Sequence, residues 1–183
     1  RLFILDGNDT LVASVTRSRE FFLGEDFSFR SWVKESKNLL APVFSGDFER
    51  AGIFRVFITY PVVDRDTGKY IGMIVTSIPT VPFFAHYGNV EKIDTQFLVA
   101  YDTKGTMLAN GASKTFIGKN FFENYTQQFI KHNQNLNNLT KNMLAGISGF
   151  AIYDYGRGER LTTSYPVVVN GIPRFFIQIV TPT

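Results

Sequence analysis

The feature of this sequence that most constrains its fold is an internal repeat. Three segments match in the same order in the two halves of the chain: residues 2–13 with 98–109, 23–27 with 117–121, and 60–63 with 165–168. In the longest pair Asp6 lies over Asp102, and in the last pair a Tyr-Pro-Val-Val sequence recurs unchanged. Three matches in series predict two copies of one fold, and a duplicated unit fixes the architecture before any single residue is interpreted.

The length of the chain accommodates two such copies. Its 183 residues suffice for two small domains that each bury a modest core. Pro79 and Pro82 interrupt the strand-like run that closes the first copy. We therefore expect a linker that begins at residues 79–82 and a boundary near Gly88, with a first module over residues 1–88 and a second over 89–183.

Both copies show the same order of expected elements. Each begins with an apolar strand, a polar turn and a second strand, the pattern of a β-hairpin. Each closes with two long strands rich in β-branched and aromatic residues, over 53–63 and 69–78 in the first copy and 160–169 and 173–180 in the second. An additional strand is expected only in the second copy, over 149–155. This order predicts an α+β fold in which each module is an antiparallel sheet of about five strands with helices on one face.

The middle of the second copy contains the clearest helical pattern, over residues 125–144. Its apolar residues recur at the spacing of one helix face: Phe129, Leu136, Leu139 and Met143. Gly146 follows where such a helix is expected to end. A second pattern concerns the adjacent pair Phe175 and Phe176. Successive side chains of a strand point to opposite faces, so one of these two rings is expected to face a helix or a partner.

Composition excludes several classes of function. The chain has no cysteine, which rules out disulfides, thiolate metal sites and thiol nucleophiles. Its net charge of +3 comes from scattered lysine and arginine residues, so nucleic acid is not an expected partner. Only two histidines are present, and no catalytic triad appears, so we expect no catalytic residue, no metal and no cofactor. No apolar run reaches the length of a membrane span.

Two loops imitate functional motifs but are better explained as turns. Residues 64–68 begin like a calcium-binding loop, although the later ligands of such a loop, including its terminal Glu, do not follow. Residues 156–159 are glycine-rich but lack the Lys-Ser or Lys-Thr of a phosphate-binding loop. Both segments are therefore predicted to be turns between strands.

The order of these motifs resembles the double Cache family, tandem PAS-like sensor domains that lie outside the membrane in chemoreceptors and sensor histidine kinases. The resemblance covers essentially the whole chain, and its marks are residues 29–32, 60–63, 64–68 and 70–74. It implies a non-catalytic, extracytoplasmic domain whose first, membrane-distal module binds a small molecule. It also implies a homodimer formed through a long N-terminal helix, and contact with the membrane only through flanking segments, none of which is within this sequence.

In amino-acid-sensing members of this family, an Arg and a Trp spaced as Arg30 and Trp32 hold the ligand carboxylate. The planar guanidinium of Arg30 suits this role because it can donate two charge-assisted hydrogen bonds to a carboxylate. Val33 stands where a Tyr is common, and Ser77 stands where an acidic residue holds the ammonium, which argues against an α-amino acid. The other candidate ligand-binding residues lie on the closing strands and the loop before them: Phe44, Ser45, Asp47, Phe57, Thr59 and Ser77.

Each of these candidates also has a purely structural interpretation. Arg30 can lie over an aromatic ring as a cation–π contact, and the strand residues can belong to an ordinary core. A second hypothesis for the chain is therefore a structural or protein-interaction module that binds no ligand, which the adjacent Phe pairs favour. An enzyme is the third hypothesis, and no motif in the sequence supports it.

Overall fold

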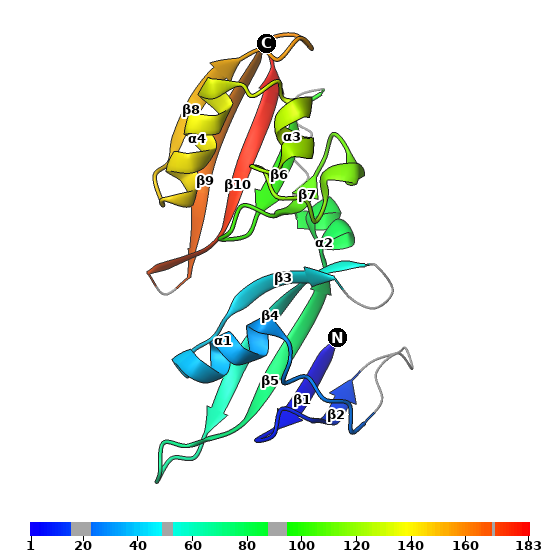
Figure 1. Ribbon diagram of the computed structural model, residues 1–183, viewed down its shortest axis with the longest axis vertical. Coiled ribbons are helices and arrows are strands. Elements are labelled where there is room, and N and C mark those ends of the chain that lie inside the picture. Colours follow the sequence, from blue (N-terminus) through cyan, green and yellow to red (C-terminus); the bar gives the residue numbers. More distant parts are fainter. Residues whose placement is uncertain (16–22, 49–52, 88–94, 170) are drawn as a thin grey trace. The chain divides into compact units, whose positions relative to one another are not determined.

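The computed structural model describes residues 1–15, 23–48, 53–87, 95–169 and 171–183 (Figure 1). The chain forms two compact units, Arg1–Asp47 with Arg55–Ile78, and Phe48–Phe54 with Pro79–Thr183. We call them the first and the second module and describe each by itself. Gly88, where the sequence predicts the boundary, lies outside the described residues, so that boundary stays a prediction.

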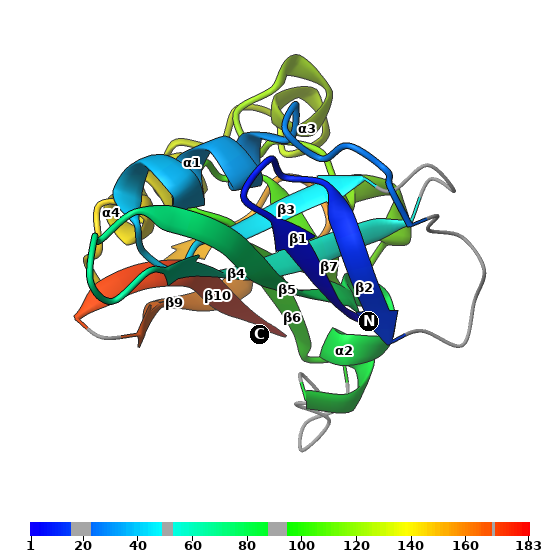
Figure 2. The same ribbon diagram turned by 90° about the horizontal axis from the view of Figure 1, so that it is seen from below.

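The first module is built on a five-stranded sheet in the order β2-β1-β5-β4-β3. Helix α1 (Ser31–Leu39) lies across one face of this sheet (Figure 2). Side chains alternate along β1, so that Phe3 is buried toward the Trp32 ring of α1 while its neighbour Ile4 is exposed on the opposite face. The strands are β1 (Leu2–Asp6), β2 (Leu11–Val15), β3 (Phe44–Phe48), β4 (Phe54–Val63) and β5 (Tyr70–Pro79).

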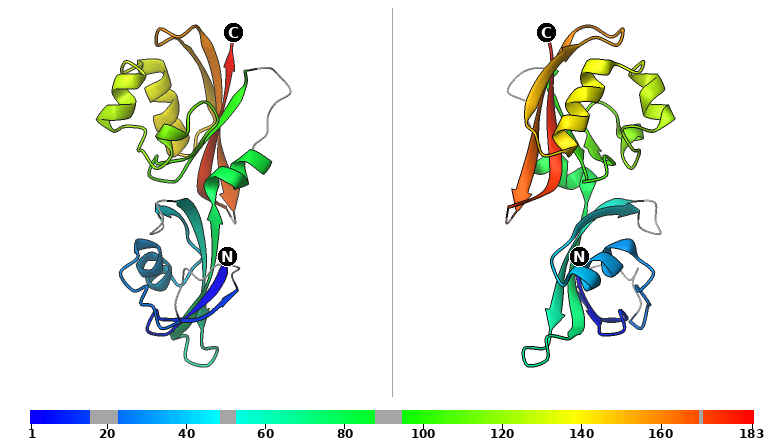
Figure 3. Two further views of the ribbon diagram at one scale, coloured as in Figure 1. Left: turned by 90° about the vertical axis from the view of Figure 1, so that its right-hand side faces the viewer. Right: turned by 60° about the vertical axis from the view of Figure 1, so that its left-hand side comes forward.

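The second module repeats this sheet in the order β7-β6-β10-β9-β8. Its strands are β6 (Phe97–Tyr101), β7 (Met107–Asn110), β8 (Gly149–Tyr153), β9 (Arg160–Val169) and β10 (Ile172–Pro182). Helices α3 (Asn124–Phe129) and α4 (Gln134–Leu144) lie on one face of the sheet, and α2 (Thr80–Tyr87) lies on the other (Figure 3). A short 3₁₀ turn, η1 (Lys114–Phe116), follows β7. The predicted α+β fold with two sheet-and-helix modules is confirmed.

The first hairpins of the two modules agree in their hydrogen bonds. The Oδ1 atom of Asp6 accepts the backbone N–H groups of Asn8 and Thr10, at 2.9 Å each. The Oδ1 atom of Asp102 accepts those of Lys104 and Thr106 in the same pattern, at 2.8 Å each. This local side-chain bonding to the backbone is the reason that Asp favours such turns. The match between Asp6 and Asp102 is therefore a repeat of structure as well as of sequence.

The additional strand predicted for the second copy has a counterpart in the first. Strand β8 occupies the edge of the second sheet, and β3 occupies the same edge of the first. The expectation of this strand in the second copy alone was therefore wrong. The sequence did not predict β3 because two of its residues, Gly46 and Asp47, are poor strand formers.

The prediction of a single helix over residues 125–144 was also wrong, because the structure contains two helices there, α3 and α4. The backbone leaves helical geometry at Lys131 and His132, whose φ angles are 52° and 50°. Asn133 then caps α4, since its side-chain oxygen accepts the backbone N–H of Leu136 at 3.1 Å. The apolar face was predicted correctly within α4, where Leu136, Leu139 and Met143 are all buried.

The segment after β5, where the sequence predicts the linker to begin, is a helix. Strand β5 ends at Pro79 and α2 begins at Thr80, with Pro82 in the first turn, where a missing N–H costs nothing. The ring of Phe84 on α2 contacts the ring of Phe175 at 6.5 Å between centroids. Phe176 points to the other face and is 1% exposed. The prediction that one ring of this Phe pair faces a helix is thus confirmed.

The two loops that imitate functional motifs are turns. The backbone N–H of Gly68 donates to the carbonyl oxygen of Asp64, and the Asp64 side chain accepts hydrogen bonds from the N–H and the hydroxyl of Thr67. These bonds, the hydroxyl first, lower the pKa of the Asp64 carboxyl. Residues 156–159 connect β8 and β9, and Asp154 accepts the backbone N–H groups of Gly156 and Arg157 there.

Candidate functional site

The first turn of α1 carries the tryptophan that the sequence singles out. Trp32 is fully buried, and its ring stacks on Phe57 of β4 with 4.7 Å between centroids and 9° between the ring planes. Phe27 and Phe3 lie against the same indole at 6.0 and 6.4 Å. The predicted candidates Trp32 and Phe57 are therefore brought together, on the face of the sheet that α1 covers.

The indole nitrogen of Trp32 is the chemically unusual atom of this site. Nε1 is buried, and none of the described residues accepts its hydrogen. A buried donor without an acceptor costs about 1–3 kcal/mol, so nearly all such groups in proteins find a protein atom, a water or a ligand. The position of Trp32 is thus one at which a bound acceptor would remove an energetic penalty.

Arg30 lies directly before α1 with an extended backbone, at φ −68° and ψ 133°. Its side chain is half-buried, and the guanidinium carbon lies 5.0 Å from the ring centroid of Phe29, which is 57% exposed. This is a cation–π contact, as the alternative, purely structural role of Arg30 predicts. The role of Arg30 in holding a ligand stays a prediction.

The other candidates lie on β3, β4 and β5. Phe44 and Ser45 are half-buried at the start of β3, and the side chain of Asp47 in the same strand lies outside the described residues. Thr59 and Ser77 are buried, and both hydroxyl groups are engaged. Thr59 Oγ1 accepts the backbone N–H of Val43 at 3.0 Å, and Ser77 Oγ accepts the Nε–H of Arg55 at 2.7 Å.

Arg55 is a residue of this site that the sequence analysis missed. It is only 5% exposed, and it lies on β4 in alternation with Phe57 and Thr59. The signal was present in the repeat. If the Tyr-Pro-Val-Val match is extended five residues toward the N-terminus, Arg55 falls on Arg160, and the structure places the two arginines on equivalent strands, β4 and β9.

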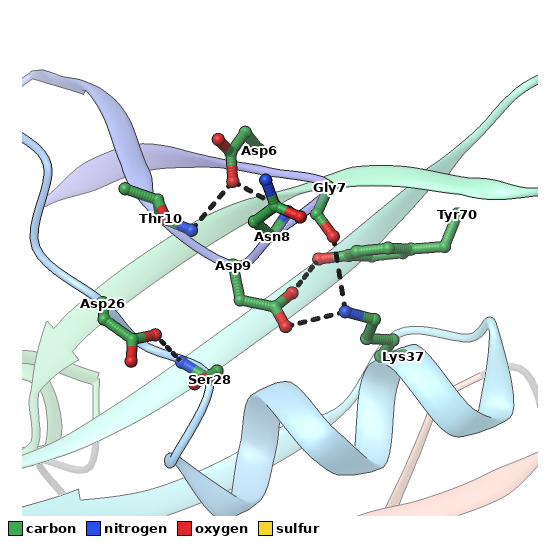
Figure 4. Close-up of polar contacts among 9 residues, drawn as sticks. All are labelled: Asp6, Gly7, Asn8, Asp9, Thr10, Asp26, Ser28, Lys37 and Tyr70. Atoms are coloured by element: carbon green, nitrogen blue, oxygen red, sulfur yellow. Dashed lines mark hydrogen bonds and ion pairs between the residues drawn. The ribbon is translucent and has the colours of Figure 1, made fainter.

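Figure 4 shows a polar cluster of Asp9, Lys37 and Tyr70, which fixes α1 to the sheet. The carboxylate of Asp9 accepts hydrogen bonds from the Lys37 ammonium of α1 and from the Tyr70 hydroxyl of β5, both at 2.8 Å. Asp9 is nearly buried, and Lys37 also lies 4.8 Å from the Tyr70 ring centroid. These contacts join the β1–β2 turn, the helix and β5, and so they hold the element that carries Trp32.

Burial raises the pKa of Tyr70, and the hydrogen bond to Asp9 and the negative charge of that carboxylate raise it further. The phenol therefore stays protonated and remains a hydrogen-bond donor throughout the physiological range. This assigns a structural function to the cluster, since each of its three groups has its partner within the cluster.

No cluster of three or more potential metal ligands occurs within the described ranges. In the same part of the chain, no helix combines the length and the apolar character needed to cross a membrane.

Comparison with known proteins shows that the fold is that of extracellular sensor domains. No known family model matches the sequence, and no curated protein sequence matches it significantly. Solved structures match the fold. An extracellular ligand-binding receptor from Desulfohalobium retbaense superposes with a TM-score of 0.72 at 16% identity, over 98% of this chain and 29% of that chain.

Two chemoreceptors are similar in the same way. The ligand-binding domain of the Pseudomonas aeruginosa amino acid chemoreceptor PctB, in complex with L-Gln, has a TM-score of 0.70 at 13% identity, over all of this chain and 67% of that chain. The periplasmic sensory domain of the Campylobacter jejuni chemoreceptor Tlp1 has a TM-score of 0.64 at 14% identity, over 88% and 58%. This chain thus spans from 29% to about two thirds of the length of these neighbours.

Proposed function

We propose that the chain is the extracytoplasmic sensing part of a transmembrane signalling protein, either a chemoreceptor or a sensor histidine kinase. The observation that carries this proposal is the match of both modules, over the whole chain, to the ligand-binding domain of a chemoreceptor solved with its ligand. The extracellular domain of a putative histidine kinase also shares the fold, with a TM-score of 0.62. The domain acts by binding a small molecule better in one conformation than in another, which shifts the population between them.

We place the ligand of the first module at the N-terminal end of α1, beside Arg30 and Trp32. The Trp32 N–H and the Arg30 guanidinium donate to its carboxylate, which supplies the acceptor that the indole needs. The site differs from one for an α-amino acid because Ser77 stands at the expected acidic position and the buried guanidinium of Arg55 adjoins it. The Ser77 hydroxyl, which accepts a hydrogen bond from Arg55, does not supply the negative charge that holds an ammonium group, and so the favoured ligand is a small organic anion.

The second candidate function, a protein-interaction module, is favoured by the uncovered face of the first sheet. Apolar side chains on this face are substantially exposed, including Leu2 at 43%, Ile4 at 41% and Ile74 at 39%. Ile4 and Ile74 lie opposite one another on the paired strands β1 and β5. In the sensing proposal, this face is covered by the N-terminal helix that the family resemblance implies, and two such helices form the homodimer.

The sensing proposal is tested by a thermal-shift screen of small mono- and dicarboxylates against the purified domain, followed by calorimetric titration of the hits. We expect at least one carboxylate to stabilise the wild type. Trp32→Phe keeps an aromatic ring, although a smaller one, and removes the N–H, while Arg30→Gln removes the charge. Each is expected to weaken binding about tenfold or more, since a hydrogen bond to a charged group contributes about 1.5–3 kcal/mol.

Arg65→Gln, in the exposed hairpin turn, is the matched control and is expected to bind like the wild type. A carboxylate that binds the wild type and both site variants equally would refute the assigned anchors. A screen without any stabilising carboxylate, combined with self-association of the domain in light scattering, would favour the interaction module instead.

A further inference from the structure

The second module contains a cavity lined by residues of its sheet and of α3 and α4. Its volume is about 350 Å³, within the range of pockets that hold small molecules. Tyr101 and Gln178, which are almost fully buried, lie at its inner end, while Ala112 and Arg157 are exposed at its mouth. The cavity thus connects the helix-covered face of the sheet with solvent.

The repeat explains why space remains at this position. Phe57 of the first module corresponds to Thr162 of the second, and Phe3 corresponds to Val99. The two phenylalanines of the first module pack with Trp32 into its core, whereas the second module has smaller side chains at both positions. A smaller residue at an equivalent core position leaves volume unless the neighbours collapse into it.

Aromatic rings form the walls of the cavity. Phe129 lies 4.7 Å from Phe116 and 5.9 Å from Tyr155 between ring centroids, and Phe97 of β6 faces the same space. Such walls favour a flat or branched apolar group, because ring faces offer large contact areas in defined orientations.

The polar groups at the inner end already have partners. Tyr101 donates its hydroxyl hydrogen to Gln178 Oε1 at 3.0 Å, and Gln178 Nε2 donates to Thr140 Oγ1 at 3.1 Å. The inner end therefore demands no polar atom from a ligand. An apolar group that enters it leaves these hydrogen bonds intact.

Two arginines lie at the outer end of the cavity. The guanidinium of Arg157 lies 4.5 Å from the Phe129 ring centroid, and that of Arg160 lies 5.3 Å from the Tyr155 centroid. Among the described residues, neither forms an ion pair, and no acidic residue lines the cavity. The Nε–H of Arg160 is moreover buried with no acceptor in this part of the structure. A carboxylate at this point would accept that hydrogen and offset the two like charges.

We propose that this cavity is a second ligand site, which binds a small monocarboxylate with an aromatic or branched apolar group. The carboxylate contacts Arg160 and Arg157 near the mouth, and the apolar group lies against the rings of Phe129 and Tyr155 that line the cavity. The positive charge at the mouth excludes amines of the same shape. This site is separate from the first-module site of the proposed function. Binding at one site can therefore be present or absent whatever the result at the other.

Phenylacetate and 3-methylbutanoate are suitable probes, and 2-phenylethylamine is the matched cation. Calorimetric titration of the full 183-residue chain is expected to show saturable binding of at least one carboxylate and none of the amine. Arg160→Gln is expected to weaken that binding about tenfold or more, and Arg160→Lys, which keeps the charge but loses the planar fork, by less. Lys141→Gln, exposed on α4 of the same module, is the control and is expected to bind normally.

The absence of cysteine offers a second measurement that is independent of whether Arg160 variants fold. Ala112→Cys places a unique thiol at the mouth, and Ala85→Cys places one on an exposed position of α2 that does not line the cavity. The carboxylate is expected to slow alkylation at position 112 and not at position 85. Failure of both carboxylates to bind would overturn the proposal, and so would binding that Trp32→Phe abolishes and Arg160→Gln leaves unchanged. The latter result would instead assign the ligand to the first module.

Discussion

Asp9 illustrates how a single residue distinguishes two copies of one turn. Its backbone has a positive φ of 65°, and its counterpart Gly105 adopts 83°. Glycine takes this geometry without strain, whereas Asp pays a modest cost and is one of the few other residues that visit it. In the first module that cost is offset by the hydrogen bonds of the Asp9 carboxylate to Lys37 and Tyr70. The polar cluster is therefore specific to the first module.

The raised pKa of Tyr70 leads to a prediction about alkaline stability. Because folding favours the protonated phenol, its contribution is complete below the ordinary tyrosine pKa of about 10 and declines as the pH rises beyond it. The free energy of unfolding of the wild type is therefore expected to fall relative to that of Tyr70→Phe between about pH 8 and about pH 11. Urea unfolding followed by circular dichroism measures this difference. A difference that stays constant over the range would contradict the assigned pKa shift.

At the scale of elements, the positions of helix ends depend on a few backbone angles. Gly146 follows α4 with a φ of 84°, and its N–H donates to the carbonyl of Met143 at 2.8 Å. The sequence predicted this end correctly because glycine favours the left-handed geometry that closes a helix. It did not predict the break at Lys131 and His132, because neither residue type is a helix breaker.

Substitution of Gly146 tests the role of this helix end. Gly146→Ala is expected to lower the free energy of unfolding by about 1 kcal/mol, the cost of a Cβ in left-handed geometry. The strain is conformational, because the added Cβ would meet only Pro173 Cγ, at 3.9 Å. Chemical denaturation provides the measurement.

Gly149→Ala is the control for this prediction. Gly149 begins β8, and an added Cβ there would make only an ordinary contact of 3.5 Å with Leu139 Cδ1. No loss of stability is expected at this position. Equal destabilisation by both substitutions would show that the effect at Gly146 does not arise from its backbone angle.

At the scale of the whole molecule, the chain contains two hydrophobic cores. One core includes Trp32 and Met73, and the other includes Phe176 and Met143, with no residue shared between them. Each core lies between one sheet and the helices that cover it. Two cores of this kind are the energetic counterpart of the sequence repeat, since each copy buries its own apolar surface.

Paired core substitutions test the independence of the two cores. Met73→Ala and Met143→Ala remove fully buried side chains, and each is expected to cost about 2–5 kcal/mol. Hydrogen exchange read by mass spectrometry is expected to show lost protection only in the module that carries the substitution. In the double variant the two losses are expected to add within about 0.5 kcal/mol, as they do for sites without shared partners. A larger deviation would show that the cores are coupled.

The sequence by itself determined the duplication, the hairpins and the long closing strands, because these follow from local periodicity and turn chemistry that recur in both halves. It also selected Trp32, whose burial beside Phe57 the structure shows. Only the tertiary structure decided which polar groups meet. Asp9 meets Tyr70 across 61 positions of the chain, and Arg55 meets Ser77 across 22. Likewise, the second-module cavity arises from the joint volume of residues on several strands and helices, which no local pattern encodes.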